Sequence, residues 1–168
     1  MLSPDYPNFH ELDLKWLDHI QKLRESKSLE KSKAENTLSV CSSCVLFRSS
    51  VCHFYFFVQL SEVLLQEPCQ ILSDLPFQIA PTDMINVVER TISRLCVLGK
   101  MQFNHALSAD DVIPLLMDVI VRTDLPGIHE SIYFMTSLAQ EQFRNSSVFG
   151  WSLVAFHSAI EQLKQTPE

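Results

Sequence analysis

Two adjacent carboxylates form the pattern in this sequence that is best suited to chemistry. Asp110 and Asp111 follow Ser108 and precede a run of apolar residues spaced as in an amphipathic helix. Ser108 and Asp111 have the spacing of a capping box, with Asp in the position usually held by Glu or Gln. Acidic residues in a first helical turn stabilise the helix dipole by about 0.3–1 kcal/mol, so both carboxylates have a structural interpretation. Asp110 nevertheless points about 100° away from Asp111 around the helix, and the alternative is that it faces a partner.

Pro114 favours that alternative. It lies in the second turn of the expected helix, where proline has no N–H to donate to the carbonyl of Asp110 and bends the start of the helix. An opened helix start beside an acidic pair is typical of a site that presents groups to a partner.

A cysteine and histidine cluster is the candidate metal site. Cys41 and Cys44 form a C-x-x-C pair, and Cys52 and His53 follow after only seven intervening residues. Structural zinc sites usually separate two ligand pairs by a dozen or more residues, so ordinary thiols are favoured and we expect no metal and no cofactor. A Cys or Ser nucleophile with one of the six His is compatible with the composition, but no G-x-S-x-G motif is present.

Length and composition indicate one folded domain. The chain has 168 residues, 46% of them hydrophobic and 20% charged, which excludes a largely disordered protein. Its net charge of −7 argues against nucleic acid or an anionic membrane surface as the main partner. The longest apolar run, residues 51–58, is far shorter than the roughly 20 residues of a membrane span. Five Cys at irregular spacing indicate reduced thiols and a cytoplasmic location.

The first sixty residues divide into two parts. Residues 1–37 predict an amphipathic helix followed by a polar segment, residues 24–36, interpreted as a frayed helix end or linker. The apolar stripe of this helix is expected at Phe9, Leu12, Trp16, Ile20 and Leu23. Residues 38–60 are apolar and Cys-rich without helical or alternating periodicity, and we expect them to be the least regular part of the chain.

Residues 61–168 predict a series of helices joined by short loops. Pro68 and Pro76 punctuate the first segments, Pro81 begins a helix, and Gly99 is its expected end. No alternating strand pattern is convincing, so the predicted fold class is an all-α helical bundle. The expected core stripes are Ile85, Val88, Ile92 and Leu95; Ile113, Leu116, Met117, Ile120 and Val121; Ile128, Ile132, Met135 and Ala139; and Ser152, Phe156, Ala159, Ile160 and Leu163.

Residues 108–138, SADDVIPLLMDVIVRTDLPGIHESIYFMTSL, resemble the central motif of the Vps-nine (vacuolar protein sorting nine) domain. That family comprises guanine nucleotide exchange factors for early-endosomal Rab GTPases. Residues 80–95 and 153–163 are similar to flanking helices of the same family, in the same order. The resemblance covers roughly residues 62–165 and implies a helical bundle that binds a small GTPase.

The resemblance also implies site residues. Asp110 stands where the family's acidic residue reaches toward the phosphate and magnesium site of the GTPase, within the same block as Asp111 and Pro114. The family's second contact is a Tyr followed by a Thr at the start of the last helix, in a Gly-Glu-x-Gly-Tyr segment. Here residues 144–147 read RNSS, and the family pattern also has Tyr and Asn where this chain has Asp118 and Ser131. The resemblance implies that Asp111, Pro114 and Asp118 also contact the GTPase. The positions of the second contact correspond to Val148, Trp151 and the neighbouring Ser152, with Leu115, Met117, Phe149 and Trp151 as candidate linings of a groove for the GTPase.

The implied function is nucleotide exchange on an early-endosomal Rab in endocytic vesicle trafficking, by a cytoplasmic protein recruited to early endosomes. Such a factor need not make or break bonds, because it stabilises the nucleotide-free GTPase and so weakens nucleotide affinity through linkage. The alternative is a degenerate Vps-nine-like module that binds a Rab or another protein without efficient exchange. An unrelated helical protein or small enzyme is the third interpretation.

Overall fold

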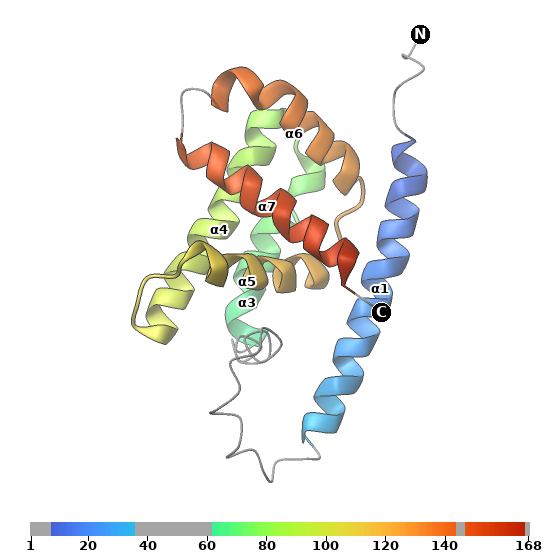
Figure 1. Cartoon of the computed structure of the whole chain (residues 1–168), viewed down its shortest axis with the longest axis vertical. Helices are drawn as coiled ribbons and strands as arrows, with labels where there is room; N and C mark the ends of the chain where they lie inside the picture. The colour runs from blue at the N-terminus through green and yellow to red at the C-terminus, as the bar shows by residue number, and fades with distance from the viewer. Residues whose placement is uncertain (1–7, 36–61, 144–146, 167–168) are drawn as a thin grey trace.

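A computed structural model of the chain describes residues 8–143 except 36–61, and residues 147–166. Within these ranges the protein is built of α-helices and one short 3-10 helix, with no strand, which confirms the all-α prediction. The expectations for residues 38–60, including the cysteine and histidine cluster, lie outside the described residues. The elements are α1 (Phe9–Glu35), α3 (Glu62–Leu72), η2 (Leu75–Phe77), α4 (Pro81–Phe103), α5 (Ala109–Arg122), α6 (Ile128–Phe143) and α7 (Ser147–Gln165) (Figure 1).

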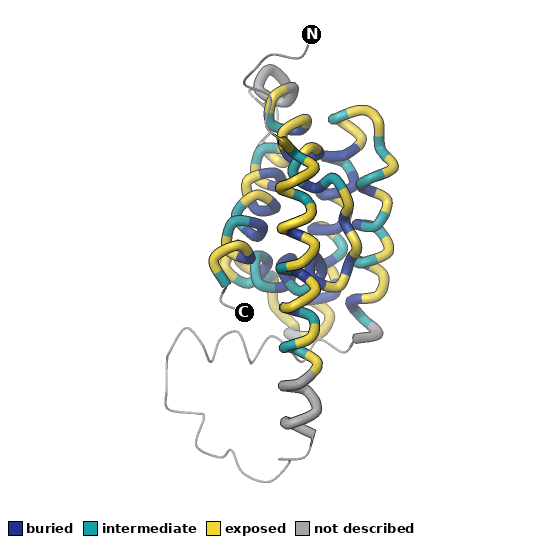
Figure 2. Tube along the Cα trace, turned by 90° about the vertical axis from the view of Figure 1, so that its right-hand side faces the viewer, coloured by how far each residue is buried: buried dark blue, intermediate teal, exposed yellow. Residues whose placement is uncertain are grey.

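Helices α3 to α7 pack around a common apolar core, and α1 lies along one side of it (Figures 1 and 2). The predicted core stripes of α4 and α7 are buried. Those of α5 and α6 are buried too, with two exceptions: Ile113 of α5 is half-buried, and the side chain of Ala139 of α6 is not described. The largest completely buried side chains come from all five helices and include Leu65, Leu95, Leu116, Met135 and Phe156. Helical periodicity alone therefore identified most of the core.

Two predicted helix boundaries are wrong. We expected α4 to end at Gly99, but it continues to Phe103 and ends at Asn104, whose φ of 57° is the left-handed conformation common at helix ends. Gly99 is buried because Leu107 packs directly on it, and a Cβ at residue 99 would lie 2.3 Å from Leu107 Cδ1. Pro68 was expected to punctuate the preceding segment, yet α3 continues through it, since one missing N–H removes only one backbone bond.

Helix α1 is longer than its apolar stripe, because the polar segment after Leu23 remains helical to Glu35. Trp16, Ile20 and Leu23 are buried in the common core as predicted, whereas Leu12 is exposed. The position facing the bundle there belongs to Asp13, whose carboxylate accepts hydrogen bonds from the backbone N–H and from Nδ1 of His129, at 3.3 and 2.8 Å. A polar contact thus replaces an apolar one at the start of the stripe.

Further polar contacts of α1 reach the carboxyl ends of α5 and α7. Arg24 donates to the carbonyl of Val121 and lies 2.7 Å from the Asp124 carboxylate, just after α5. His19 Nε2 lies 2.8 Å from the carbonyl of Leu163 on α7. Because α5 and α7 pack together and both end at α1, their amino-terminal ends lie on the side of the bundle away from α1 (Figure 1).

None of the helices in the described part of the chain is long and apolar enough to cross a membrane.

Candidate functional site

The two adjacent aspartates at the start of α5 have different surroundings. Asp111 completes the predicted capping box, since its Oδ2 accepts hydrogen bonds from the backbone N–H of Ser108 at 2.9 Å and from the Ser108 hydroxyl at 2.6 Å. This carboxylate is thereby held against the helix end. The capping interpretation is confirmed for Asp111.

Asp110 is exposed, and its carboxylate has no hydrogen bond or ion pair within the described residues. Pro114 lies inside α5, so the N–H that would bond to the Asp110 carbonyl is missing. Both the carboxylate and the carbonyl of Asp110 are therefore acceptors without a helical partner. The exposed carboxylate places a negative charge at the amino-terminal end of α5, where free N–H groups would otherwise favour an anion.

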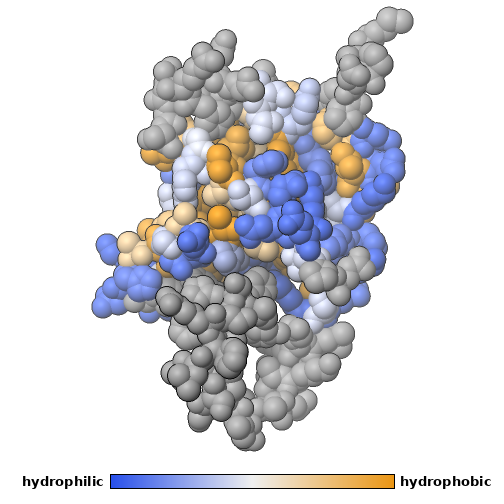
Figure 3. All heavy atoms as spheres, in the orientation of Figure 1, coloured by the Kyte–Doolittle hydropathy of each residue, from blue (hydrophilic) through white to orange (hydrophobic). Residues whose placement is uncertain are grey.

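The amino-terminal turns of α7 carry a strip of exposed apolar side chains. Val148 is 58% exposed and Val154 is 64% exposed, and Phe149 and Trp151 between them are also exposed. We call these four residues the α7 apolar strip. Apolar (orange) atoms gather on the left of the face that α7 crosses in Figure 3. The strip lies in the amino-terminal half of α7 and Asp110 in the first turn of α5; these two helices pack together, and their amino-terminal ends lie on the side of the bundle away from α1 (Figure 1).

Val148 continues a line of residues that is otherwise buried. Ser152, Ala155 and Ala159 follow it at steps of four, three and four residues, which places them on one side of α7, and all three are buried. The first turn of α7 thus extends beyond the core, and its apolar side chains have no covering element among the described residues. Such an uncovered apolar surface is typical of a contact site.

Several predicted contact residues are buried instead. Leu115 and Met117 pack in the core, and Ser152 is only 1% exposed. Asp118 is largely buried and pairs with Lys27 of α1 at 2.9 Å and with Arg122 at 3.0 Å. In this conformation Asp118 attaches α1 to α5, and it lies nearer the α1 end of α5 than Asp110 does.

Sequence reasoning missed Val154 as part of the exposed strip. Its signal was present, because Val148, Trp151 and Val154 recur every three residues and so drift away from the predicted core stripe. Of the described residues, the two cysteines Cys69 and Cys96 are both half-buried, and their thiols are poor candidates for a nucleophile. Burial raises the pKa of Cys69 and of Cys96, which lowers the fraction of nucleophilic thiolate near neutral pH. The described residues contain no cluster of side chains able to hold a metal ion.

Comparison with known families agrees with this geometry. Residues 65–168 match the vacuolar sorting protein 9 (VPS9) domain, so the match spans more than half of the chain and includes α4 to α7. A comparison with individual curated proteins gives no match. A VPS9 domain implies Rab nucleotide exchange as the general type of function and a small GTPase as the partner. The chain belongs to the VPS9 domain family.

Proposed function

We propose that this protein is a guanine nucleotide exchange factor for a Rab GTPase of the early-endosomal type. The observation that carries the proposal is that two packed helices present an exposed carboxylate and an exposed apolar surface: Asp110 on α5, which has no partner among the described residues, and the α7 apolar strip. Asp110 is assigned to the catalytic contact. Asp111 and Pro114 shape the backbone that presents it.

The carboxylate acts by electrostatics. A GTPase holds its nucleotide with Mg²⁺ and with groups that neutralise the phosphates, so a carboxylate directed at that region competes for the cation and repels the phosphates. Asp111 strengthens the effect because it occupies the donors of the Ser108 cap, which would otherwise attract phosphate. Asp110 then opposes the nucleotide without a partner that must first be displaced.

The α7 apolar strip supplies the binding energy. Exchange requires that the nucleotide-free GTPase be bound more tightly than the loaded form, because a ligand shifts an equilibrium only by its difference in affinity for the two states. Aromatic side chains such as Phe149 and Trp151 are the usual anchors of protein interfaces. We assign them to the displaced switch segments of the GTPase, with Val148 at the edge of the contact.

One observation favours the second candidate function, binding of a Rab without efficient exchange. Val148 stands at the position of the family's Tyr and is exposed, but it offers no hydroxyl to a partner. Ser152, the nearest hydroxyl to the position of the family's Thr, is buried. We therefore expect slow exchange by the wild-type chain, which Val148→Tyr should accelerate.

The test is the release of fluorescent GDP from a panel of purified Rab GTPases in the presence of the 168-residue chain. We expect acceleration for early-endosomal members, and Trp151→Ala should weaken binding to the nucleotide-free Rab by about tenfold or more. Binding that is equal for loaded and nucleotide-free Rab, with no acceleration for any member, would support the second candidate. Absence of binding to every member would refute both.

The cellular role follows from the partner. We propose action in endocytic vesicle trafficking, with recruitment from the cytoplasm to early endosomes. Fluorescence microscopy of the tagged chain together with an early-endosomal marker tests this, and a diffuse distribution unaffected by Rab expression would contradict it.

A further inference from the structure

The connection between α4 and α5, residues 104–108, determines where α5 begins. It leaves α4 at Asn104, whose backbone N–H donates to the carbonyl of Lys100 at 3.0 Å and whose φ of 57° turns the chain. Residues 104–106 and 108 are exposed. Leu107 is the one residue of this connection that is half-buried, and its side chain packs against the apolar core. The connection is therefore attached to the body of the domain mainly through Leu107.

Leu107 lies directly on Gly99 of α4. Gly99 is buried, and Cγ and both Cδ atoms of Leu107 lie 2.9 Å or less from the place that a Cβ on residue 99 would occupy. Non-bonded carbon atoms are most stable at about 3.5–4.0 Å, so even an alanine at residue 99 would force the whole Leu107 side chain to move. The absence of a side chain at Gly99 thus provides the space in which Leu107 is held.

Leu107 and Val112 occupy the two positions of a hydrophobic staple around the first turn of α5. Ser108 is the N-cap, so Leu107 is the residue before the cap and Val112 is the fourth residue of the helix. Apolar side chains at these two positions fix the angle at which the chain enters a helix. Val112 is buried, whereas Asp110 between them is exposed and has no hydrogen-bond or ion-pair partner among the described residues. The position of the Asp110 carboxylate is therefore set by the backbone of this turn.

Pro114 makes the first turn more dependent on Leu107. Because proline has no N–H to donate to the carbonyl of Asp110, one of the backbone bonds that would join the first turn to the rest of α5 is missing. The capping box joins Ser108 to Asp111 within the turn, so it does not replace that bond. Contacts of the flanking residues must then hold the turn in place.

We propose that Leu107, packed on Gly99, is a positioning residue for nucleotide exchange. It holds the first turn of α5 at a fixed angle and so keeps the Asp110 carboxylate directed at the nucleotide site of the GTPase. This role depends on the proposed exchange function, since Leu107 acts only through Asp110. A misplacement of about 1 Å in a group that acts on a reacting centre can cost roughly a hundredfold in rate. Loss of the Leu107 contact should therefore slow exchange, although the α7 apolar strip remains.

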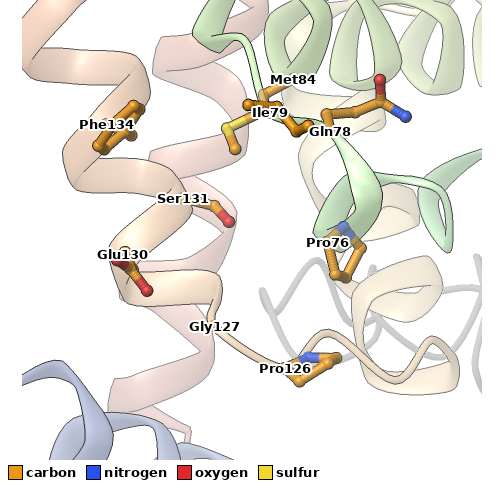
Figure 4. Close-up of a pocket in the computed structure, with 9 residues that line it drawn as sticks. All are labelled: Pro76, Gln78, Ile79, Met84, Pro126, Gly127, Glu130, Ser131 and Phe134. Carbon is orange, nitrogen blue, oxygen red and sulfur yellow. The ribbon is translucent and has the colours of Figure 1, made fainter.

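A control position lies toward the opposite end of α4. Met84 is buried there and lines a pocket of about 250 Å³ together with residues of η2 and α6 (Figure 4). It precedes Gly99 by about 22 Å along the helix, at a rise of 1.5 Å per residue. The pocket is lined by no residue of α5 or α7. Met84→Ala should thus destabilise the domain without displacing Asp110.

The test compares Leu107→Ala, Leu107→Met and Met84→Ala in the 168-residue chain by two measurements. The first is hydrogen–deuterium exchange of the chain alone, at the amides of Asp111 and Val112, which both donate to the carbonyl of Ser108 at 3.1 Å. Amides at a helix end exchange through local opening rather than global unfolding. Leu107→Ala should therefore speed their exchange several-fold, whereas Met84→Ala should leave it unchanged. Leu107→Met keeps an apolar side chain of similar volume and should resemble wild type.

The second measurement is GDP release from an early-endosomal Rab, with kcat and KM for the loaded GTPase determined separately. We expect Leu107→Ala to lower kcat by about tenfold and to change KM by less than about twofold, because the α7 apolar strip is unaltered. Leu107→Met and Met84→Ala should keep kcat near the wild-type value. General destabilisation would instead lower the activity of Met84→Ala as well.

Three results would overturn the inference. They are unchanged amide exchange in Leu107→Ala, an equal loss of kcat in Met84→Ala, and a rise in KM in place of a fall in kcat, which would mean that Leu107 contacts the GTPase directly. Asp110→Ala separates this inference from the proposed function. Acceleration that is lost in Asp110→Ala but kept in Leu107→Ala contradicts the positioning role alone. No acceleration by wild type, or full acceleration by Asp110→Ala, contradicts the proposed exchange site and the positioning role with it.

Discussion

Removal of the Asp111 carboxylate tests whether the two aspartates of α5 have different roles. In Asp111→Ala, the backbone N–H and the hydroxyl of Ser108 both lose their acceptor, and the helix loses a favourable charge in its first turn. Loss of such a cap costs about 0.5–2 kcal/mol, and the dipole contribution is included in that range. Since the site is exposed and water replaces part of the lost bonding, we expect about 1 kcal/mol.

The assay is urea denaturation followed by circular dichroism at 222 nm, with thermal unfolding as a second measurement. For a domain of this length, 1 kcal/mol corresponds to a decrease in Tm of about 2–4 °C. Asp110→Ala is the matched control on the neighbouring residue. Asp110 has no hydrogen-bond or ion-pair partner among the described residues, so only its dipole contribution should be lost, at the lower end of about 0.3–1 kcal/mol.

A double-mutant cycle identifies the interaction itself. Ser108→Ala and Asp111→Ala should not be additive, with a coupling energy of about 0.5 kcal/mol or more, because each removes the same hydrogen bonds. Equal destabilisation by Asp110→Ala and Asp111→Ala, or additivity of the cycle, would refute the assignment of separate roles.

Three further predictions concern the scaffold. Asp118→Ala removes its ion pairs with Lys27 and Arg122 and should lower the free energy of unfolding by about 1 kcal/mol, measured by urea denaturation. No change would show that these two ion pairs contribute nothing to the attachment of α1. Gly99→Ala should destabilise by about 1–3 kcal/mol through its clash with Leu107, whereas a gain would mean that Leu107 moves freely. Cys69 and Cys96 should react with iodoacetamide at pH 8 more slowly than free cysteine, because their raised pKa lowers the fraction of thiolate at any pH below that pKa. The rates are measured by peptide mass spectrometry, and rates equal to that of free cysteine would contradict this prediction.

The helices were predictable because their signals are local. The capping box of Ser108 and Asp111 and the buried stripes of α4 and α7 depend on spacing within one helix, and the structure confirms them. The errors at Gly99 and Pro68 have a different origin. A glycine can end a helix, or it can lie inside one where a neighbouring side chain needs the space. Gly99 is of the second kind because Leu107 packs on it, and the spacing of residues within one helix does not show this contact.

The candidate site was predictable only in part. Spacing indicated that Asp110 and Asp111 point in different directions, but the exposure of Val148 and the burial of Ser152 depend on how far α7 extends beyond the core. The attachment of α1 through Asp13 and Asp118 was not predictable, because each pairs with a residue about a hundred positions away in the sequence. The partners are His129 for Asp13 and Lys27 for Asp118. Long-range polar contacts leave no periodic signal in a single sequence.

The rate of GDP release from an early-endosomal Rab, compared among wild type, Asp110→Ala and Asp111→Ala, tests the central claim most directly. We predict that wild type accelerates release, that Asp110→Ala abolishes the acceleration with stability nearly unchanged, and that Asp111→Ala retains it with lowered stability. Binding of Asp110→Ala to the nucleotide-free Rab should be weaker by about 1–3 kcal/mol, the usual size of a coupling free energy. Strong acceleration by wild type that Asp110→Ala leaves intact would contradict the assignment of the exchange site.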